Sequence, residues 1–534
     1  MIMKSNYIKG LTGLLVLTGI TSCEEPQREP LRPNILFCLA DDISFPHMGI
    51  YGTDWVNTPN FDRLASQGIL FTNAYTPNAK CGPSRSTILT GRNSWQLEEA
   101  ANHFCYFPDK FKVYPEVFQE AGYHVGFTGK GWAPGNPGMV DGVRRQLTGQ
   151  NYSSIHTQPP TTGISPNDYS ANFNMFLNDN PDQKPFVFWY GSMEPHRGYE
   201  FASSLNKDGR TLEEIDLVPP FWPDTDSVRT DMLDYAMEIA HFDMHLGRMI
   251  DMLESRGMLD NTLIVVTSDN GMPFPRVKGQ KYEFSNHMPL AIMWKDGIKN
   301  PGRVVKQHVS FIDFAPTFLD VSGLDPDKAG MAPITGTSLL LILEDKRNYQ
   351  RLYNDYVLIG KERHDMGRPD DQGYPVRGLV KDGFLYIHNF ETGRWPSGNP
   401  ETGYPNADES PTKTVTLSTL FNPEKQHYWR MNFGLRPSHE LYNIIDDPYC
   451  ITNLANSDQH QKQLEYMKEF MFGKLREQED PRMFGNGHIF DAYEYSGADK
   501  NYYNRLMAGE EITPGWIRAS DKQSMDEVLN RIAN

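Results

Sequence analysis

A cysteine, a proline and an arginine form the first candidate for chemistry in this chain. Residues 81–85 read Cys-Gly-Pro-Ser-Arg. If a helix begins at Cys81, Arg85 lies four residues later on the same side, where its fixed positive charge could stabilise an oxyanion formed at position 81. A structural cysteine before a turn, with Arg85 in a surface ion pair, is the alternative interpretation.

Four oxygen-bearing side chains form a second candidate site. Asp41 and Asp42 follow one apolar run of the sequence, and Asp269 and Asn270 follow another. Carboxylate and amide oxygens suit Ca²⁺ or Mg²⁺ rather than soft metals, and buried carboxylates repel one another unless a cation lies among them. Each pair alone could cap a helix or form a turn. The two pairs together with the cysteine segment indicate a metal site.

The acidic charge of the chain restricts its partners. The formal net charge of −17 argues against a nucleic-acid partner, because such proteins need a basic surface. A polyanionic substrate would need a local basic cluster, which can focus a positive potential inside an acidic shell. Lys130, His196 and Lys278 could supply that cluster, although each alone is more often found at a solvated surface.

Three apolar runs are expected to place these side chains at one edge of a sheet. Residues 34–40, 186–190 and 262–267 each have the continuous apolar character of a strand buried on both faces of a parallel sheet. Polar residues follow each run, and ligands bind beyond the carboxyl ends of strands in open α/β sheets. Apolar residues at spacings of three and four over residues 235–253 predict a helix that ends at Gly257. The fold class predicted is α/β.

The length of the chain allows one large domain and one smaller domain, because single hydrophobic cores stop growing at about 250–300 residues. From about residue 350 the sequence becomes polar, Tyr-rich and Pro-rich, with short strand-like stretches. We expect a catalytic domain over residues 33–350, a C-terminal subdomain over 351–480 with a helix over 461–479, and a C-terminal extension over 481–534.

The N-terminus has the features of an export signal. Two lysines precede an apolar run at residues 11–20, which is too short to span a bilayer as a mature helix. The residues before Cys23 resemble the bacterial lipobox, so we expect residues 1–22 to be removed, Cys23 to be lipidated, and residues 23–32 to form a tether. We therefore expect an exported protein that is anchored to a bacterial membrane. The alternative is an ordinary signal peptide that ends near a cysteine.

The remaining cysteines predict no disulfide framework. The chain has 5 Cys in all. If Cys23 carries lipid and Cys81 is modified, then Cys38, Cys105 and Cys450 remain, an odd number without metal-type spacing.

Several motifs together resemble those of a known enzyme family. Residues 81–85 resemble the Cys-x-Pro-Ser-Arg signature of formylglycine-dependent sulfatases, which belong to the alkaline phosphatase-like superfamily. Residues 86–92 continue that pattern, and residues 58–65 resemble another block of the family. Residues 194–197 and 268–275 are closest to the N-sulfoglucosamine sulfohydrolase (heparan N-sulfatase) branch.

The resemblance covers most of the chain, from about Pro33 to Leu454. It implies an alkaline phosphatase-like fold, with a large mixed sheet between helices and a smaller C-terminal antiparallel sheet. It also implies that a formylglycine-generating enzyme oxidises Cys81 to formylglycine (3-oxoalanine). One hydroxyl of the aldehyde hydrate would then attack sulfur, and the second would drive the release of sulfate.

Site roles follow from the same resemblance. Arg85 would stabilise the deprotonated hydrate, His196 would be the general acid, and Lys130 and Lys278 would grip the sulfate. The family uses Ca²⁺, and the ligands implied for it are Asp41, Asp42, Cys81, Asp269 and Asn270.

One position departs from the family pattern. Trp132 stands where the family's Gly-Lys-x-His segment has its histidine, which contacts the formylglycine. His103 or His47 could fill that role, or this branch could do without it.

The expected function is a sulfatase acting on a sulfated polysaccharide or oligosaccharide, either a glycosaminoglycan such as heparan or an algal polymer such as ulvan. Arg363, His364 and Arg377 of the second unit are candidate sugar contacts, with surface placement as the alternative. Two other functions stay open: a formylglycine-dependent phosphonate or phosphodiester hydrolase, and an inactive lipoprotein that binds sulfated glycans, which the substitution at Trp132 favours.

Overall fold

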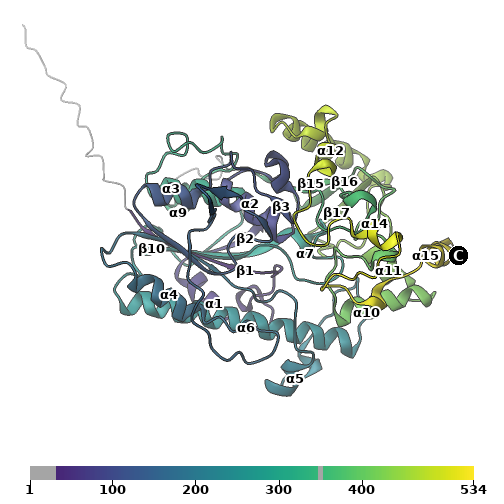
Figure 1. Cartoon of the computed structure of the whole chain (residues 1–534), viewed down its shortest axis with the longest axis horizontal. Helices are drawn as coiled ribbons and strands as arrows, with labels where there is room; N and C mark the ends of the chain where they lie inside the picture. Colours follow the sequence, from purple (N-terminus) through teal and green to yellow (C-terminus); the bar gives the residue numbers. More distant parts are fainter. Residues whose placement is uncertain (1–31, 347–352, 534) are drawn as a thin grey trace, which may run out of the picture.

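The structure is a computed structural model that describes residues 32–346 and 353–533 (Figure 1). The expected signal peptide over residues 1–22, the lipidated Cys23 and all of the tether except Arg32 lie outside the described residues. No helix in the described part of the chain is long and apolar enough to cross a membrane.

The three predicted strands lie side by side in the large sheet. Strand β1 (Asn34–Ala40) pairs in parallel with β10 (Thr262–Ser268) on one side and with β9 (Phe186–Gly191) on the other. All residues of these strands are buried, as their unbroken apolar character predicts. The carboxyl ends of the three strands therefore meet at one edge.

The large sheet is mixed. Its described strands follow the order β12-β2-β11-β10-β1-β9-β4-β8, and β13 also pairs with β2. Strand β11 is antiparallel to both of its neighbours, whereas the other pairings along this order are parallel. The further strands are β2 (Ile69–Tyr75), β4 (His124–Gly129), β8 (Gln150–Asn151), β11 (His287–Met293), β12 (Arg303–Val305) and β13 (Val309–Ser310).

Helices cover both faces of this sheet (Figure 1). Alternate residues of β1 divide between two cores, with Phe37 packed on one face and Leu36 on the other, because successive strand side chains point to opposite faces. The helices on the Phe37 face are α2 (Cys81–Thr90), α3 (Tyr114–Glu120), α8 (Phe314–Val321) and α9 (Leu340–Leu343); those on the Leu36 face are α1 (Pro59–Gln67), α4 (Tyr169–Asn178) and α6 (Asp226–Ser255).

Helix α6 confirms the helix predicted from apolar spacing, and it begins nine residues earlier than that pattern. The side chain of Thr225 accepts a hydrogen bond from the backbone N–H of Val228 and so caps the first turn. The helix ends before Gly257, whose φ of +67° is the left-handed conformation that commonly follows a helix.

A smaller antiparallel sheet forms the second unit. Its strand order is β14 (Tyr356–Lys361), β15 (Val376–Lys381), β16 (Phe384–Asn389) and β17 (His439–Asn443). Helix α12 (Gln461–Glu477) confirms the helix predicted there, and its buried residues pack against this sheet. The fold class is therefore confirmed: a large mixed sheet between helices, with a separate small antiparallel sheet.

The C-terminal residues pack back onto the second unit. Phe490 joins the core beneath α12, and Val528 packs against Trp429. The sequence predicted no structure for this segment. Its helices are α13 (Ile489–Ala492), α14 (Tyr502–Met507) and α15 (Met525–Ala533). The domain boundaries at residues 350 and 480 stay predictions, and the first lies outside the described residues.

Candidate active site

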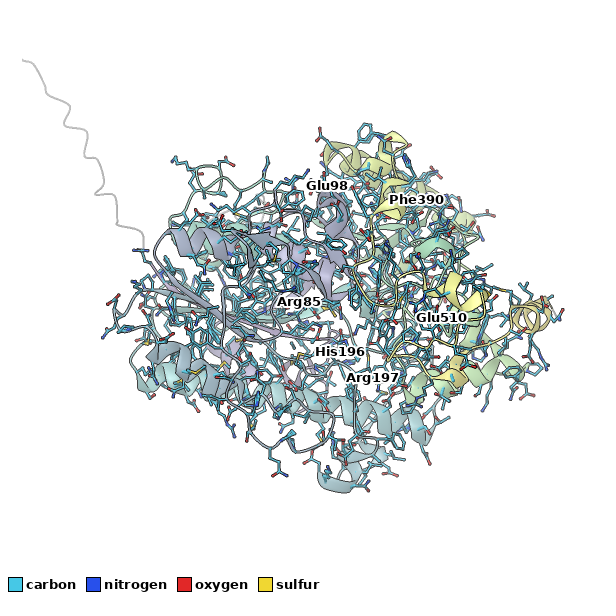
Figure 2. The ribbon with its side chains drawn as sticks, in the orientation of Figure 1. Arg85, Glu98, His196, Arg197, Phe390 and Glu510 are labelled. Atoms are coloured by element: carbon cyan, nitrogen blue, oxygen red, sulfur yellow. The ribbon has the colours of Figure 1, made fainter. Side chains whose placement is uncertain are left out.

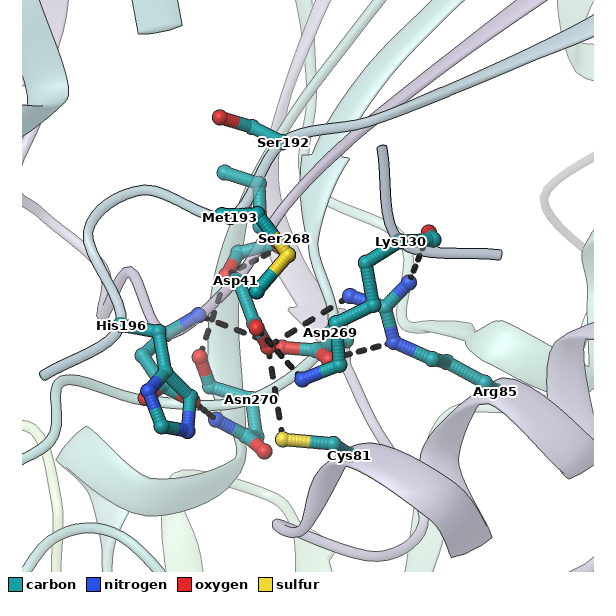
Figure 3. A network of polar contacts seen from close by, with 12 residues as sticks. Asp41, Cys81, Arg85, Lys130, Ser192, Met193, His196, Ser268, Asp269 and Asn270 are labelled. Atoms are coloured by element: carbon teal, nitrogen blue, oxygen red, sulfur yellow. Dashed lines mark hydrogen bonds and ion pairs between the residues drawn. The ribbon is translucent and has the colours of Figure 1, made fainter. Parts of the chain in front are cut away.

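The loops after β1 and β10 and the start of helix α2 meet at one edge of the large sheet. Figure 3 shows Asp41, Asp269 and Cys81 pointing toward one another from these three elements. Figure 2 places Arg85 and His196 in the middle of the molecule, between the large sheet and the second unit. The topology thus collects residues that are far apart in the sequence.

Helix α2 begins at Cys81, and all of its residues are buried. The thiol lies 3.3 Å from Oδ1 of Asp41. One turn later, Nε of Arg85 donates to Oδ2 of Asp269 at 2.8 Å, and its Nη1 donates to the carbonyls of Lys130 and Gly131 at 2.7 and 2.8 Å. Arg85 is therefore fixed between the acidic loops and the end of β4.

The acidic side chains form a cluster with metal-ligand spacing. One ligand atom from each of Asp41, Asp42, Cys81 and Asp269 lies within 4.8 Å of the others, and all four residues are buried. Oδ1 of Asn270 is also buried and has no hydrogen-bond partner. A hard divalent cation fits this set of oxygen donors, because it would satisfy the free amide oxygen and screen three carboxyl groups.

Two lysines reach the same acids. Nζ of Lys130 forms an ion pair with Asp41, and Nζ of Lys278 lies 2.6 Å from Oδ2 of Asp42 and 2.8 Å from Oδ2 of Asp408. The sequence pattern did not indicate Asp408, which comes from the second unit. Positive groups therefore border the acidic cluster, and these are the groups that an anionic substrate needs.

Ionisation of the cluster is uneven. Burial opposes ionisation of Asp41, but the charges of Lys130, His196 and Arg85 outweigh burial and lower its pKa well below the usual value. Burial and the nearby Asp41 raise the pKa of Asp269 to about 7. Asp41 is therefore the carboxylate that stays ionised next to Cys81.

The Cys81 thiol itself is a poor nucleophile in this setting. Burial raises its pKa well above the ordinary value, and the charge of Asp41 raises it further. The thiolate is the reactive form of cysteine, so a protonated thiol at this position would contribute little to chemistry.

A cavity of about 620 Å³ opens beside this cluster. It brings together Cys81, Lys130, His196 and Lys278, which the sequence had suggested separately. Nδ1 of His196 lies 3.1 Å from the carbonyl oxygen of Arg197. Lining residues that sequence reasoning missed or left undecided are Lys80, His103, Phe104, Asp365, Asp408 and Trp516.

Trp132 and the two candidate histidines have different places. The indole N–H of Trp132 donates to Oγ of Ser86 at 2.8 Å, so its polar atom is engaged with helix α2. His103 lines the cavity. His47 instead packs among aromatic rings, with Nδ1 3.1 Å from the hydroxyl of Tyr235. Only His103 of these two histidines reaches the site.

The structure does not bring the three candidate sugar contacts to the cavity. Arg363 donates to the backbone carbonyls of Tyr493 and Glu494, and His364 bonds to Asn78 at 2.7 Å. Arg377 forms buried ion pairs with Asp480 and Glu362. The physical reason is that each side chain is buried and bonded elsewhere, Arg363 to the C-terminal extension, His364 to the catalytic domain and Arg377 to acids of the second unit, so none lines the cavity.

The fold and the site combine a buried acidic cluster that could hold a metal ion with basic side chains beside a cavity. A family model described as Sulfatase matches residues 33–324. The chain belongs to the sulfatase family, whose members are sulfuric ester hydrolases, and the predicted family is confirmed.

Relatives extend this match over most of the chain. N-sulphoglucosamine sulphohydrolase of Homo sapiens is 28% identical over 479 residues, covering 84% of this chain and 91% of that protein. An ulvan-active sulfatase of Formosa agariphila is 24% identical over 489 residues, covering 82% and 73%. A solved structure in complex with its substrate D-glucosamine-2-N,6-O-disulfate has a TM-score of 0.58 and 20% identity, covering 84% and 98%; this likeness shows the fold alone.

Replacement of Arg85 by methionine should destabilise the fold. The substitution leaves Asp269 buried without its cation and leaves Asp41 with Lys130 alone, and breaking a buried pair costs about 3–5 kcal/mol. Urea unfolding in calcium-free buffer measures the change. Arg505→Met, which removes an exposed ion pair with Glu510, is the control and should shift the midpoint little. Equal midpoints for both variants would show that Arg85 is not the cation on which this cluster depends.

Proposed function

We propose that the protein is a sulfatase that removes sulfate from a sulfated saccharide, with Cys81 converted to formylglycine and Ca²⁺ held by the acidic cluster. The observation that carries this proposal is the position of Cys81. It begins a buried helix, faces an ionised carboxylate, and lies in a cavity bordered by Lys130, His196 and Lys278.

The calcium ligands proposed are those that the sequence suggested. The ion would be held by side-chain oxygens of Asp41, Asp42, Asp269 and Asn270, together with the modified residue 81. The unpartnered Oδ1 of Asn270 supports its assignment as a calcium ligand. A bound calcium would polarise a sulfate oxygen and neutralise charge that develops on it.

Conversion of Cys81 explains why a buried, protonated thiol occupies this position. Formylglycine supplies a geminal hydroxyl in place of the thiol as the nucleophile, and it requires a formylglycine-generating enzyme as a maturation partner. Oδ1 of Asp41, 3.3 Å from Sγ of residue 81, is placed to accept the proton of a hydroxyl there. Arg85 is fixed by four hydrogen-bond acceptors, one of which is Oδ1 of Asp41, and so holds a positive charge beside that oxygen.

His196 is placed to protonate the leaving group. A carbonyl oxygen only accepts hydrogen bonds, so the contact with the Arg197 carbonyl places a proton on Nδ1 of His196. Nε2 can donate to the leaving group only when the ring takes up a second proton, and burial and the charge of Lys278 lower the pKa at which it does so. Lys130 and Lys278 carry the charges that would orient the sulfate. His196 is therefore the general acid in this proposal.

A heparan-type glucosamine sulfate is the substrate class that we favour. The human relative is an N-sulphoglucosamine sulphohydrolase and matches most of both chains. A cavity of about 620 Å³ is within the usual range for a small ligand. An algal polysaccharide is the second candidate, because another relative is an ulvan-active sulfatase.

Replacement of Cys81 by alanine should reduce sulfate release to background, because it removes the group that becomes the nucleophile. Sulfate release is measured over a panel of N-sulfated and O-sulfated glucosamines and ulvan fragments, on protein in which peptide mass confirms formylglycine at position 81. Folding and calcium binding should largely survive in the variant, because the four other proposed calcium ligands remain.

Cys105→Ala is the matched control, because Cys105 is a buried thiol that does not line the cavity. It should retain turnover. Full activity of Cys81→Ala would refute the mechanism. Hydrolysis of phosphate diesters without any sulfate release by mature protein would favour the phosphoester alternative, and no turnover of either kind would favour a glycan-binding lipoprotein.

Calcium should raise the melting temperature. A ligand at a hundred times its Kd stabilises the folded state by about 2.7 kcal/mol. Differential scanning fluorimetry with and without a chelator measures the shift. Asp269→Asn, within the cluster, should abolish most of it, whereas Asp182→Asn at the surface should not. A shift produced by Zn²⁺ but not by Ca²⁺ would contradict this ligand assignment.

We also propose that the protein is exported and anchored through lipid on Cys23. The lipobox-like residues before Cys23 support this proposal. In a bacterial host that processes lipoproteins, the wild-type protein should fractionate with membranes, and Cys23→Ala should lose lipid and leave the membrane fraction. Immunoblotting of the fractions measures the difference. An unlipidated, membrane-free wild-type protein would instead indicate an ordinary signal peptide.

A further inference from the structure

We propose that His103 accepts a hydrogen bond from a hydroxyl group of the sugar ring that carries the sulfate, and that Trp516 forms the apolar wall beside that ring. This inference rests on the proposed sulfatase function and defines which part of the substrate the cavity recognises. His103 and Trp516 both line the cavity that contains Cys81.

His103 has a free polar atom in the site. Its side chain is buried, with Nδ1 3.0 Å from Oδ1 of Asp365, and Nε2 has no hydrogen-bond partner. It lies against the first turn of helix α2, because a Cβ built on Gly82 would be 3.5 Å from Cδ2 of His103. An unpartnered buried nitrogen beside the reactive residue is a feature that a substrate group would satisfy.

The chemistry of that nitrogen follows from its neighbour. Burial opposes ionisation of Asp365, but the charge of Lys80 and the hydrogen bonds from His103 and Lys80 lower the pKa of Asp365 below its usual value. A carboxylate only accepts hydrogen bonds, so Nδ1 of His103 carries a proton. Burial lowers the pKa of His103 to about 4, so the ring is neutral near pH 7 and Nε2 presents a lone pair. A lone pair repels the oxygens of a sulfate group and attracts a hydroxyl donor. His103 therefore recognises the sugar and not the sulfate.

Three parts of the chain make this arrangement rigid. Lys80, immediately before Cys81, forms an ion pair with Asp365 at 2.8 Å, and both side chains are buried. Asp365 belongs to the second unit, beyond strand β14, whereas His103 belongs to the catalytic domain. Asp365 is thus a positioning residue that sets the tautomer and orientation of His103.

Trp516 supplies the apolar surface. Its indole N–H donates to the carbonyl of Pro405 at 3.0 Å, and its ring lies nearly parallel to that of Phe104, with centroids 6.2 Å apart. With its only donor engaged, the ring presents an apolar face. Trp516 also lines a neighbouring cavity of about 190 Å³ beyond His196. It therefore stands where a saccharide extends from the reactive centre.

The test measures binding in the Cys81→Ala background, so that it does not depend on turnover. Glucosamine N-sulfate, or a sulfated ulvan disaccharide if that binds more tightly, is titrated calorimetrically in calcium buffer. His103→Ala should raise Kd by about tenfold or more, as expected for loss of one buried hydrogen bond. Trp516→Ala should raise it by about three- to tenfold. His427→Ala, an exposed histidine on α11 (Gln426–Phe433), is the control and should leave Kd unchanged.

Monodeoxy derivatives of the same saccharide identify the hydroxyl group. For the derivative that lacks the hydroxyl group bound by His103, the wild-type protein and the His103→Ala variant should have the same Kd, because the hydrogen-bond donor is missing. Equal effects of His103→Ala on every derivative would overturn the assigned hydrogen bond. Failure of the Cys81→Ala protein to bind any sulfated saccharide would overturn both this inference and the proposed substrate class. If sulfated saccharides bind tightly and the binding depends on His103, but mature protein releases no sulfate, then the proposed sulfatase function is wrong and the proposed binding site stands.

The role of Asp365 has its own measurement. Asp365→Asn should move the imidazole proton of His103 away from Nδ1, which the ¹⁵N chemical shifts of the two ring nitrogens report, and should weaken saccharide binding. Asp365→Glu should restore part of both. Weakened binding with an unchanged tautomer would show that Asp365 has a merely structural role.

Discussion

The structure depends on the burial of several carboxyl groups beside one cysteine. Asp41, Asp42 and Asp269 lie at the carboxyl edge of the large sheet without exposure to water, an arrangement that is stable only if positive charge balances it. Arg85 and two lysines supply that charge from helix α2, the end of β4 and the loop after β10. The same ion pairs hold helix α2, the end of β4 and the loop after β10 together, so a substitution that changes the charge of the site also changes the packing of these elements.

Much of this arrangement could be predicted from the sequence, because its signals are local. The strands at residues 34–40 and 262–268 are mostly apolar, and Asp41-Asp42 and Asp269-Asn270 follow them directly, so adjacency in the chain gives adjacency at the sheet edge. The pentapeptide around Cys81 carries its own geometry, since Arg85 is one helical turn away. A strand buried on both faces and a helix of fixed period each allow few other conformations for such segments.

The sugar side of the cavity could not be predicted in the same way. Asp365, Asp408 and Trp516 reach the site from loops of the second unit and the C-terminal extension, and no local pattern distinguishes them from surface residues. Arg363 and His364 adjoin Asp365 in the sequence, yet their side chains are buried and bonded away from the cavity, and their role as sugar contacts stays a prediction. Neighbouring residues in an irregular loop point in directions that only the packing of distant segments determines.

This division explains what the family match does and does not establish. The matched residues 33–324 contain the acidic cluster, Cys81, Arg85 and the basic side chains Lys130, His196 and Lys278, to which we assign the reaction. Asp365 and Trp516 lie beyond them, where the second unit closes the cavity. The two parts are joined at the cavity by buried ion pairs, from Lys80 to Asp365 and from Lys278 to Asp408, so a change in the second unit at these acids would also reach the basic groups beside Cys81. In this chain the indole N–H of Trp132 is engaged by Ser86, whereas Nε2 of His103 has no partner among the described residues. The proposed sugar contact therefore combines His103 of the matched segment with Asp365 and Trp516 from beyond it.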